Sequence, residues 1–407
     1  MADPGGSTSV FGGGSRDTGL SALSRRGFLR GVGAGGVATA AAGVLAACSG
    51  STEEPRSSDT ATPTPTDALV ISNWRAYIDR GTVDGERVSP TLATFEDESD
   101  VTVSYNQDVN DNEDFFDKIR NALAAGEPTG RDLFMLTDWM AAKLIRLDYL
   151  QPIDKANVPN ATNLIPPLSD VVFDPNRDYS LPWQSGLTGI AVNQNVFDGD
   201  VTTMTELLTN SRLKGRVTVL TEMRDTMGLL LLEQGSNPAD FTIDEWEQAL
   251  GVLQSAVDSG QIRGFTGNDY IPGLQRGDIA ACLAWSGDVI QAQFEDPKIL
   301  FNLPEAGAML WSDNMLIPNG AQNKLNAEAW MNYYYDPEVA AQLASRVRYI
   351  CPVQGAQDAM KRIDKSLVDN PLVFPTEEDY AKLSVFRGLT EDEVTAFTEQ
   401  FLAVQGG

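Results

Sequence analysis

The sequence contains no histidine and only three cysteines among its 407 residues. Without histidine the chain has no Ser-His-Asp triad, no Cys-His dyad and no histidine metal ligand, which excludes much of hydrolytic enzymology. Three cysteines cannot form a disulfide framework, and no Cys-x-x-Cys spacing exists for zinc or thioredoxin-like chemistry. Basic residues are also scarce, since 30 Lys and Arg stand against 57 Asp and Glu, for a net charge of -27. Such a chain repels phosphates and anionic lipid, so we expect no nucleic acid among its partners.

The length and the apolar content indicate a folded protein of more than one domain. A chain of 407 residues exceeds what one hydrophobic core usually organises, so two domains are expected. A hydrophobic fraction of 42% with 8% aromatic residues supplies enough side chains for folded cores. The composition therefore excludes a wholly disordered chain.

The N-terminal segment has the pattern of an export signal. Residues 24–30, Ser-Arg-Arg-Gly-Phe-Leu-Arg, resemble the twin-arginine motif, and a Gly/Ala/Val run follows over residues 31–47. The run ends in Leu-Ala-Ala before Cys48, which resembles a bacterial lipobox. This resemblance implies that residues 1–47 are removed as a signal peptide and that Cys48 is lipidated. The alternative is a transmembrane helix over the same run, although Gly and Ala dominate it.

A change of composition after Cys48 marks the start of the folded part. Residues 48–66 have no hydrophobic periodicity and contain several Pro, Ser and Thr, so we expect a flexible tether. From Asp67 onward, apolar runs typical of strands alternate with amphipathic segments typical of helices. Predicted strands cover 68–72, 101–105, 133–136, 189–192, 216–220, 278–285 and 309–317, and predicted helices include 114–125, 138–147, 243–259, 327–335 and 336–347. This alternation predicts an α/β fold with helices on both faces of the sheets.

Several short motifs occur in order between residues 69 and 387, at or beside predicted strands. They are Asn73-Trp74-Arg75-Ala76-Tyr77, Phe173-Asp174-Pro175-Asn176-Arg177-Asp178-Tyr179-Ser180-Leu181-Pro182-Trp183, Gly189-Ile190-Ala191-Val192-Asn193, Leu220-Thr221-Glu222-Met223-Arg224-Asp225, Ala284-Trp285-Ser286-Gly287 and Trp311-Ser312-Asp313. Together they resemble the extracellular polyamine-binding proteins of bacterial ABC importers, the spermidine/putrescine-binding type. The resemblance implies a non-enzymatic receptor, expected as a monomer without cofactor or metal, that delivers a polyamine to an ABC permease.

The same resemblance implies a type II periplasmic-binding-protein fold, in which two lobes enclose a ligand cleft. Lobe 1 is expected to comprise residues 67–185 and 312–354, and lobe 2 residues 186–311 and 355–407. Because the chain crosses between the lobes more than once, closure is expected to be a hinge motion. The expected location is outside the cytoplasmic membrane, with the protein anchored through its lipid.

A polyamine is a flexible methylene chain with two or more ammonium groups, so its site needs spaced carboxylates with flat apolar surfaces between them. Aromatic faces cover methylenes and attract cations, at roughly 0.5 to 2 kcal/mol per contact. By family position, the resemblance implies an aromatic box of Trp74, Tyr77, Trp139, Trp285, Trp311 and Tyr349. It implies as ammonium partners Glu222, Asp225 and Asp313, with Thr137 as a hydroxyl and Arg387 in the region of a ligand-contacting amide.

Some of these residues also have a purely structural interpretation. A tryptophan at a strand end often belongs to the core, and Glu222 and Asp225 can cap the helix expected over 224–234. Asp313 is different, because it interrupts an apolar strand and a buried charge needs a partner.

Arg75 and Arg387 depart from the family pattern. Each repels a polycation unless it pairs with a carboxylate such as Asp138. The ligand therefore stays open between putrescine, spermidine and a zwitterionic amine whose carboxylate an arginine would hold.

The sequence gives little support to two other function classes, an exported enzyme and an iron(III)-binding protein. An exported enzyme would need a nucleophile elbow, a histidine or a metal cluster, and the sequence has none. An iron(III)-binding protein would need paired tyrosines, but residues 333–335 lie in a predicted helix, where adjacent side chains diverge.

Cys282 and Cys351 are expected to be reduced and structural, with a disulfide as the alternative.

Overall fold

The computed structural model describes residues 67–83 and 86–406. The predicted signal peptide, the lipidation site at Cys48 and the tether lie outside these residues, as does the alternative transmembrane run. Within the described residues, no helix combines the length and the apolarity needed to cross a bilayer.

Strands and helices alternate along the described chain, as the sequence pattern predicts. The strands are β1 (Ala68–Trp74), β2 (Gly81–Val83), β3 (Glu86–Val88), β4 (Thr102–Val109), β5 (Leu133–Thr137), β6 (Ser180–Asn193), β7 (Val217–Leu220), β8 (Ile262–Thr266), β9 (Ala281–Trp285), β10 (Ile299–Asn302), β11 (Ala308–Leu316) and β12 (Leu383–Ser384). The helices are α1 (Pro90–Ser99), α2 (Asn112–Ala125), α3 (Asp138–Arg146), α4 (Met204–Thr209), α5 (Met223–Glu233), α6 (Ile243–Asp258), α7 (Tyr270–Arg276), α8 (Ser286–Glu295), α9 (Lys324–Tyr334), α10 (Pro337–Val347), α11 (Ala356–Ile363), α12 (Glu377–Tyr380) and α13 (Glu391–Gln405). Short 3₁₀ helices cover Pro159–Asn163, Pro166–Leu168 and Ser211–Leu213.

Local sequence signals explain several of the helix ends. Ser89 caps α1 by accepting a hydrogen bond from the Leu92 backbone, and Pro90 occupies the first helical position. The helix α2 ends at Gly126 with a φ of 66°, a conformation that glycine adopts without a Cβ penalty.

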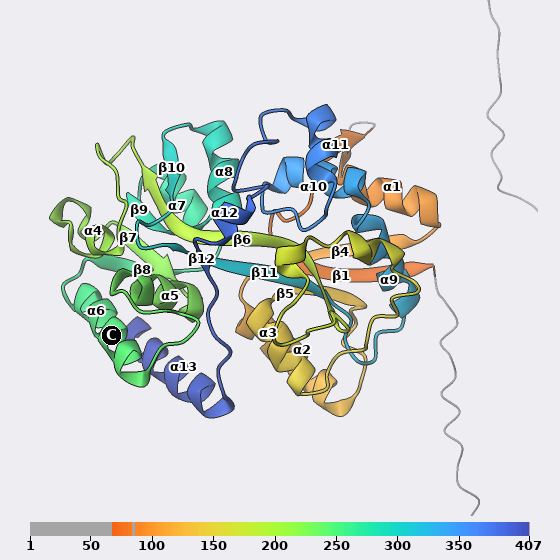
Figure 1. Ribbon diagram of the computed structural model, residues 1–407, viewed down its shortest axis with the longest axis horizontal. Coiled ribbons are helices and arrows are strands. Elements are labelled where there is room, and N and C mark those ends of the chain that lie inside the picture. Colours follow the sequence, from red (N-terminus) through yellow and green to blue (C-terminus); the bar gives the residue numbers. More distant parts are fainter. Residues whose placement is uncertain (1–66, 84–85, 407) are drawn as a thin grey trace, which may run out of the picture. The chain divides into compact units, whose positions relative to one another are not determined.

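The strands form one sheet of ten strands and a separate two-stranded hairpin of β2 and β3. The main path through the sheet is β4-β1-β5-β11-β6-β9-β7-β8. The pairs β1–β4, β1–β5, β7–β8 and β7–β9 are parallel, whereas β11 and β6 pair antiparallel with each other and with their outer neighbours. Figure 1 shows β6 and β11 running side by side between the group of β1, β4 and β5 and the group of β7, β8 and β9.

The strand β6 is much longer than the predicted segment 189–192, since it spans fourteen residues that are all buried. Pro182 and Gly186 lie within it, and both discourage a strand prediction. The structure accommodates Pro182 next to a register shift between Asp313 and Asn314 in β11. It requires glycine at Gly186, because a Cβ there would overlap the indole ring of Trp311.

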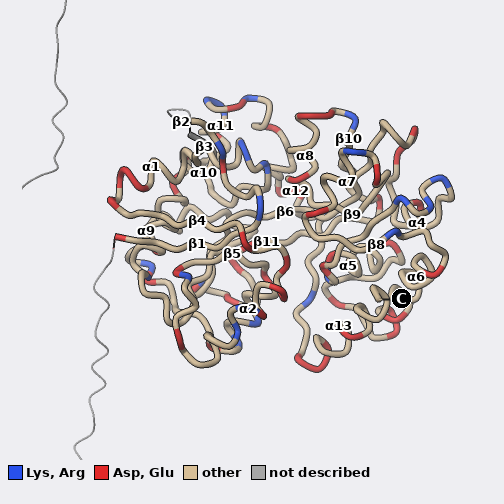
Figure 2. Tube along the Cα trace, turned by 180° about the vertical axis from the view of Figure 1, so that it is seen from behind, with Lys and Arg blue, Asp and Glu red and all other residues tan. Residues whose placement is uncertain are grey.

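The predicted lobe boundaries at residues 185/186 and 311/312 fall inside β6 and β11. These are the strands that connect the two groups of parallel strands. The boundaries themselves stay predictions. Acidic residues are distributed over most elements of the fold (Figure 2), so the negative charge is not gathered at one site.

Candidate functional site

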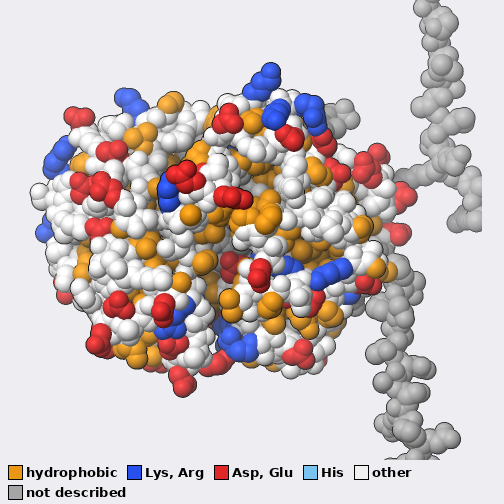
Figure 3. All heavy atoms as spheres, viewed as in Figure 1, with side chains coloured by type: hydrophobic (Ala, Val, Ile, Leu, Met, Phe, Trp, Pro, Cys, Tyr) orange, Lys and Arg blue, Asp and Glu red, His pale blue; other side chains and the backbone are white. Residues whose placement is uncertain are grey.

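A cavity of about 840 Å³ lies within the described fold. Figure 3 shows a hollow near the middle of the face that it draws, where hydrophobic and acidic side chains meet. All eleven residues predicted to bind ligand line this cavity, namely Trp74, Tyr77, Thr137, Trp139, Glu222, Asp225, Trp285, Trp311, Asp313, Tyr349 and Arg387. The structure thus brings the whole predicted set together, while their contact with ligand stays a prediction.

Strand ends place most of these side chains. Trp74, Thr137 and Trp285 are the last residues of β1, β5 and β9, and Glu222 follows β7 by two residues. In open α/β sheets, ligands bind beyond the carboxyl ends of parallel strands, where backbone groups leave room for side chains to converge. Asp313 comes from the middle of β11 and pairs there with Thr137 of β5.

The aromatic side chains form a connected group along the cavity. Ring centroids are 5.0 Å apart for Tyr77 and Tyr349, 5.6 Å for Trp311 and Tyr349, and 6.3 Å for Trp285 and Trp311. These spacings are typical of favourable tilted and edge-to-face pairs. A Cβ at Gly287 would overlap the Tyr349 ring, so this glycine makes room for the aromatic group.

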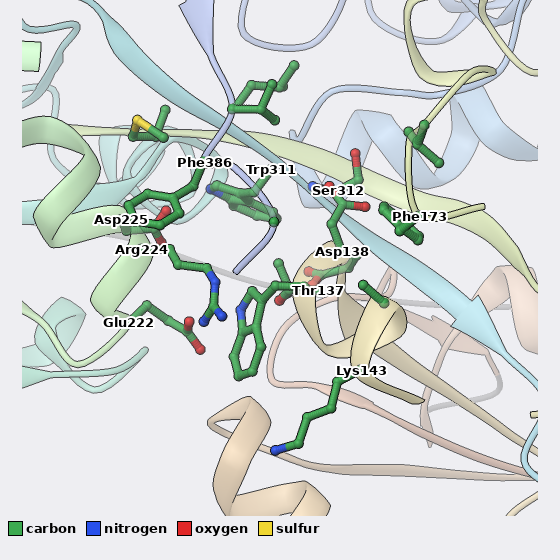
Figure 4. Close-up of a pocket in the computed structure, with 18 of the residues that line it drawn as sticks. Thr137, Asp138, Lys143, Phe173, Glu222, Arg224, Asp225, Trp311, Ser312 and Phe386 are labelled. Carbon is green, nitrogen blue, oxygen red and sulfur yellow. Dashed lines mark hydrogen bonds between the residues drawn. The ribbon is translucent and has the colours of Figure 1, made fainter. Parts of the chain in front are cut away.

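A chain of hydrogen bonds joins two of the predicted carboxylates. The Thr137 hydroxyl donates to Asp313 Oδ1 at 2.9 Å and accepts from Asn112 Nδ2 at 2.9 Å. The same Asn112 amide donates to Glu222 Oε1 at 2.9 Å, and its Oδ1 accepts from the Thr137 backbone. Figure 4 shows Thr137 and Glu222 on elements that face each other across the site. Asn112 therefore fixes the positions of both acidic groups.

Burial gives these carboxyl groups an unusual protonation. It raises the pKa of Asp313 to about 7 and that of Asp225 to about 6. Burial, with the nearby charges of Asp111 and Asp225, raises the pKa of Glu222 to about 8. Because burial makes the charged form of these carboxyl groups costly, an incoming cation beside them favours ionisation.

Neighbouring donors hold two further acids of the cavity. Asp225 accepts a 2.9 Å hydrogen bond from the indole N–H of Trp285. Asp288 accepts three hydrogen bonds, from Asn268, Tyr270 and Tyr349, the last at 2.7 Å. The sequence analysis did not identify Asp288, which orients the predicted ligand residue Tyr349.

The capping interpretation of Glu222 and Asp225 finds limited support. Glu222 is the N-cap residue of α5, but its side chain makes no capping hydrogen bond and turns to Asn112 instead. Asp225 lies in the first turn of α5 and bonds to Trp285. Both carboxyl groups are therefore used in the cavity rather than at the helix end.

The arginines differ in their environment. Arg387 forms an ion pair of 2.6 Å with Glu393 and lies 4.3 Å from the Phe241 ring centroid. Arg75 lines the cavity with an exposed side chain. Asp138, the carboxylate suggested as a partner for them, instead accepts hydrogen bonds from Ser312 and Asn314. The carboxylate that neutralises Arg387 is therefore Glu393 and not Asp138, the example that the sequence analysis gave.

Residues 91–375 match the family described as bacterial extracellular solute-binding protein, which covers more than half of the chain. The chain belongs to this family. It is 25% identical over 310 residues to the spermidine/putrescine-binding periplasmic protein of Escherichia coli, covering 76% of this chain and 84% of that protein. It is 28% identical over 334 residues to the putrescine-binding periplasmic protein PotF of the same organism, covering 77% and 85%.

Solved structures show the same fold. The spermidine/putrescine substrate-binding protein PotD of Streptococcus pneumoniae superimposes with a TM-score of 0.68 at 24% identity, covering 84% of this chain and 99% of that one. The TpPotD lipoprotein of Treponema pallidum has a TM-score of 0.70 at 22% identity, covering 84% and 100%. The expected two-lobe periplasmic-binding fold is thereby confirmed.

Family membership decides between function classes. This solute-binding protein is a transport component and not an enzyme, as the sequence analysis expected. The tyrosines considered for iron(III) do not converge on one point. The hydroxyl groups of Tyr333, Tyr334 and Tyr335 donate to the backbone carbonyls of Thr91, Trp183 and Pro182. Among the described residues, no group of acidic or cysteine side chains could hold a metal ion.

The two cysteines of the folded part are buried and unpaired, as predicted. Burial raises the pKa of Cys351 to about 12 and that of Cys282 further, so both stay protonated and unreactive.

The sequence analysis did not identify three residues that line or support the cavity: Asn112, Arg224 and Asp288. Arg224 lies within the quoted motif around Glu222, so the motif was a signal that could have pointed to it.

Proposed function

We propose that this solute-binding protein captures a polyamine of the putrescine or spermidine class and delivers it to an ABC permease. The observation that carries the proposal is Asp313, a carboxyl group only 4% exposed, held by Thr137 in a cavity with aromatic walls. A buried carboxyl of this kind needs a cationic partner, and an alkylammonium group supplies one. The spermidine- and putrescine-binding names of its relatives support the same ligand class.

The proposed binding event couples charge pairing with ionisation. An ammonium group beside Asp313 or Asp225 favours the ionised carboxylate, so protons leave the cavity as the amine enters. The methylene groups of the amine pack on the faces of Trp285 and Trp311, and cation–π attraction adds to the pairing. The hydrogen bonds of Thr137 and Asn112 hold the acidic groups in place, so little side-chain ordering remains for the ligand to induce.

We propose that closure of the two lobes, residues 67–185 with 312–354 and 186–311 with 355–407, encloses the amine. The exported protein acts as a monomer, anchored through a lipid at Cys48 to the outer face of the cytoplasmic membrane. The tether of residues 48–66 then leaves the folded part free to reach the permease.

Calorimetric titration of the purified protein with putrescine, spermidine, spermine and 4-aminobutyrate tests the proposal. Micromolar or tighter binding of at least one polyamine, with protons released on binding, is the expected result. Binding of 4-aminobutyrate alone would replace the polyamine with a zwitterionic amine, and binding of none of the four would refute the proposal.

A further inference from the structure

Arg224 lines the cavity, although the sequence analysis did not include it among the site residues. It is the second residue of α5, between the predicted ligand residues Glu222 and Asp225. Its guanidinium carbon lies 4.1 Å from the ring centroid of Trp139, a cation–π arrangement. Figure 4 shows the Arg224 side chain reaching from the turn of Glu222 and Asp225 toward the element that carries Thr137. The protein thus places its own cation on one of the predicted aromatic walls.

Arg224 is charged beside acidic groups of the cavity without forming an ion pair, since the nearby carboxyl groups of Glu222, Glu113 and Asp225 favour its charged form. Of the four other basic residues that line the cavity, three form ion pairs, Lys143 with Glu113, Arg146 with Glu391 and Arg387 with Glu393, at 2.9, 2.8 and 2.6 Å. The fourth, Arg75, has an exposed side chain, whereas Arg224 lies inside the cavity. Arg224 has no ion pair and no hydrogen bond with any described residue. Burial lowers the pKa of Arg224 to about 10, which still leaves the guanidinium charged at neutral pH.

The acidic residues of the cavity differ in how far groups of the protein already satisfy their carboxyl oxygens, and therefore in how well each can pair with a ligand ammonium. Asp313, Asp225 and Glu222 accept hydrogen bonds of 2.9 Å from Thr137, Trp285 and Asn112. The hydroxyl groups of Tyr77 and Thr188 also favour the ionised forms of Asp313 and Asp225. Asp288 accepts three hydrogen bonds, and Asp138 faces the guanidinium of Arg177. When the first three ionise around a cation, Arg224 balances one of the negative charges. Two charges then remain for the ligand.

We infer that Arg224 is a specificity-determining residue, which fills one cation position of the cavity and restricts the ligand to two ammonium groups. This inference rests on the proposed function and names the polyamine within it. The diamine putrescine matches the two remaining charges, whereas the third ammonium of spermidine would meet an aromatic face that is already covered and a like charge beside it.

Arg224→Met tests the inference, because methionine keeps an unbranched apolar stem on Trp139 and removes the charge. We expect the unaltered protein to bind putrescine at least about tenfold more tightly than spermidine. In Arg224→Met the ratio of spermidine affinity to putrescine affinity should rise at least about tenfold, equivalent to about 1.4 kcal/mol. Arg224→Gln, which keeps a polar end, should shift the ratio in the same direction.

The control is Arg120→Met, an identical loss of charge at an exposed position of α2 outside the cavity, for which the ratio should stay within about twofold. Melting curves establish that each variant is folded, and titrations use putrescine, spermidine and 4-aminobutyrate. Unchanged ratios in both Arg224 variants would overturn the inference and leave the proposed function standing. Binding of 4-aminobutyrate that both variants lose would also overturn it, since Arg224 would then hold a carboxylate. If the folded parent binds none of the amines, the proposed function and the inference fail together.

Discussion

Asp313→Asn is the most direct test of the charge pairing in the cavity. The substitution keeps the size of the side chain, and its amide oxygen can still accept the hydrogen bond from Thr137. Only the negative charge is lost. Because Asp313 is 4% exposed, a ligand ammonium beside it would remain buried without a counterion.

The expected magnitude follows from burial and protonation together. Truncating one partner of a buried, hydrogen-bonded charge pair costs about 2 to 5 kcal/mol in binding. Against this, the pKa of Asp313 near 7 means that about half of the empty cavities must first release a proton at pH 7. That ionisation costs about 0.4 kcal/mol, which leaves a net loss of about 1.6 kcal/mol or more, so we expect affinity to fall about 15-fold or more at pH 7 and further at pH 8.

Isothermal calorimetry with putrescine measures the change. The matched control is Asp170→Asn, the same substitution at an exposed position on the rim of the cavity, which should change the affinity by less than about twofold. The ligand-free Asp313→Asn protein should melt at the temperature of the parent or higher at pH 7, because the hydrogen bond survives and the cost of ionising a buried carboxyl group is removed. If Asp313→Asn binds every amine as tightly as the parent does, the proposed site is wrong.

Three further predictions concern pH, thiols and export. Putrescine affinity should rise from pH 5 to pH 8, because the amine pairs with ionised carboxyl groups. The pKa values of Asp225, Asp313 and Glu222 lie near 6, 7 and 8. An affinity that calorimetry finds unchanged over this pH range would contradict the prediction. In the ligand-free protein, a raised pKa means that ionisation of the buried carboxyl group destabilises the fold, so the melting temperature should fall from pH 5 to pH 8. Glu222→Gln removes one of these carboxyl groups and should make the fall in melting temperature smaller. In Cys48→Ser protein, Ellman's reagent should detect two thiols only after denaturation, and fewer than two would argue for a disulfide. The same variant should leave the membrane fraction of the producing cell, and its retention there would count against a lipid anchor.

The predicted ligand residues came from the resemblance of the ordered motifs to a known family, and short apolar runs in the sequence placed three of them at strand ends. Trp74, Thr137 and Trp285 each end a strand that the pattern of apolar residues predicts within two residues. The strand β6 was mostly missed, since Pro182 and Gly186 look like strand breakers in isolation. In the folded protein, a register shift in β11 accommodates Pro182, and the indole ring of Trp311 in β11 leaves no room for a side chain at Gly186.

The alternation of apolar runs in the sequence determined the α/β class, and the resemblance of its ordered motifs to a known family supplied the family and the set of side chains that line the cavity. Only the tertiary structure decided how those side chains interact. Asn112 lies 25 residues from Thr137 and 110 from Glu222, so no local pattern could show that it holds both. The position of Arg224 on Trp139 likewise depends on how α5 and α3 face each other, which is a property of packing rather than of sequence spacing.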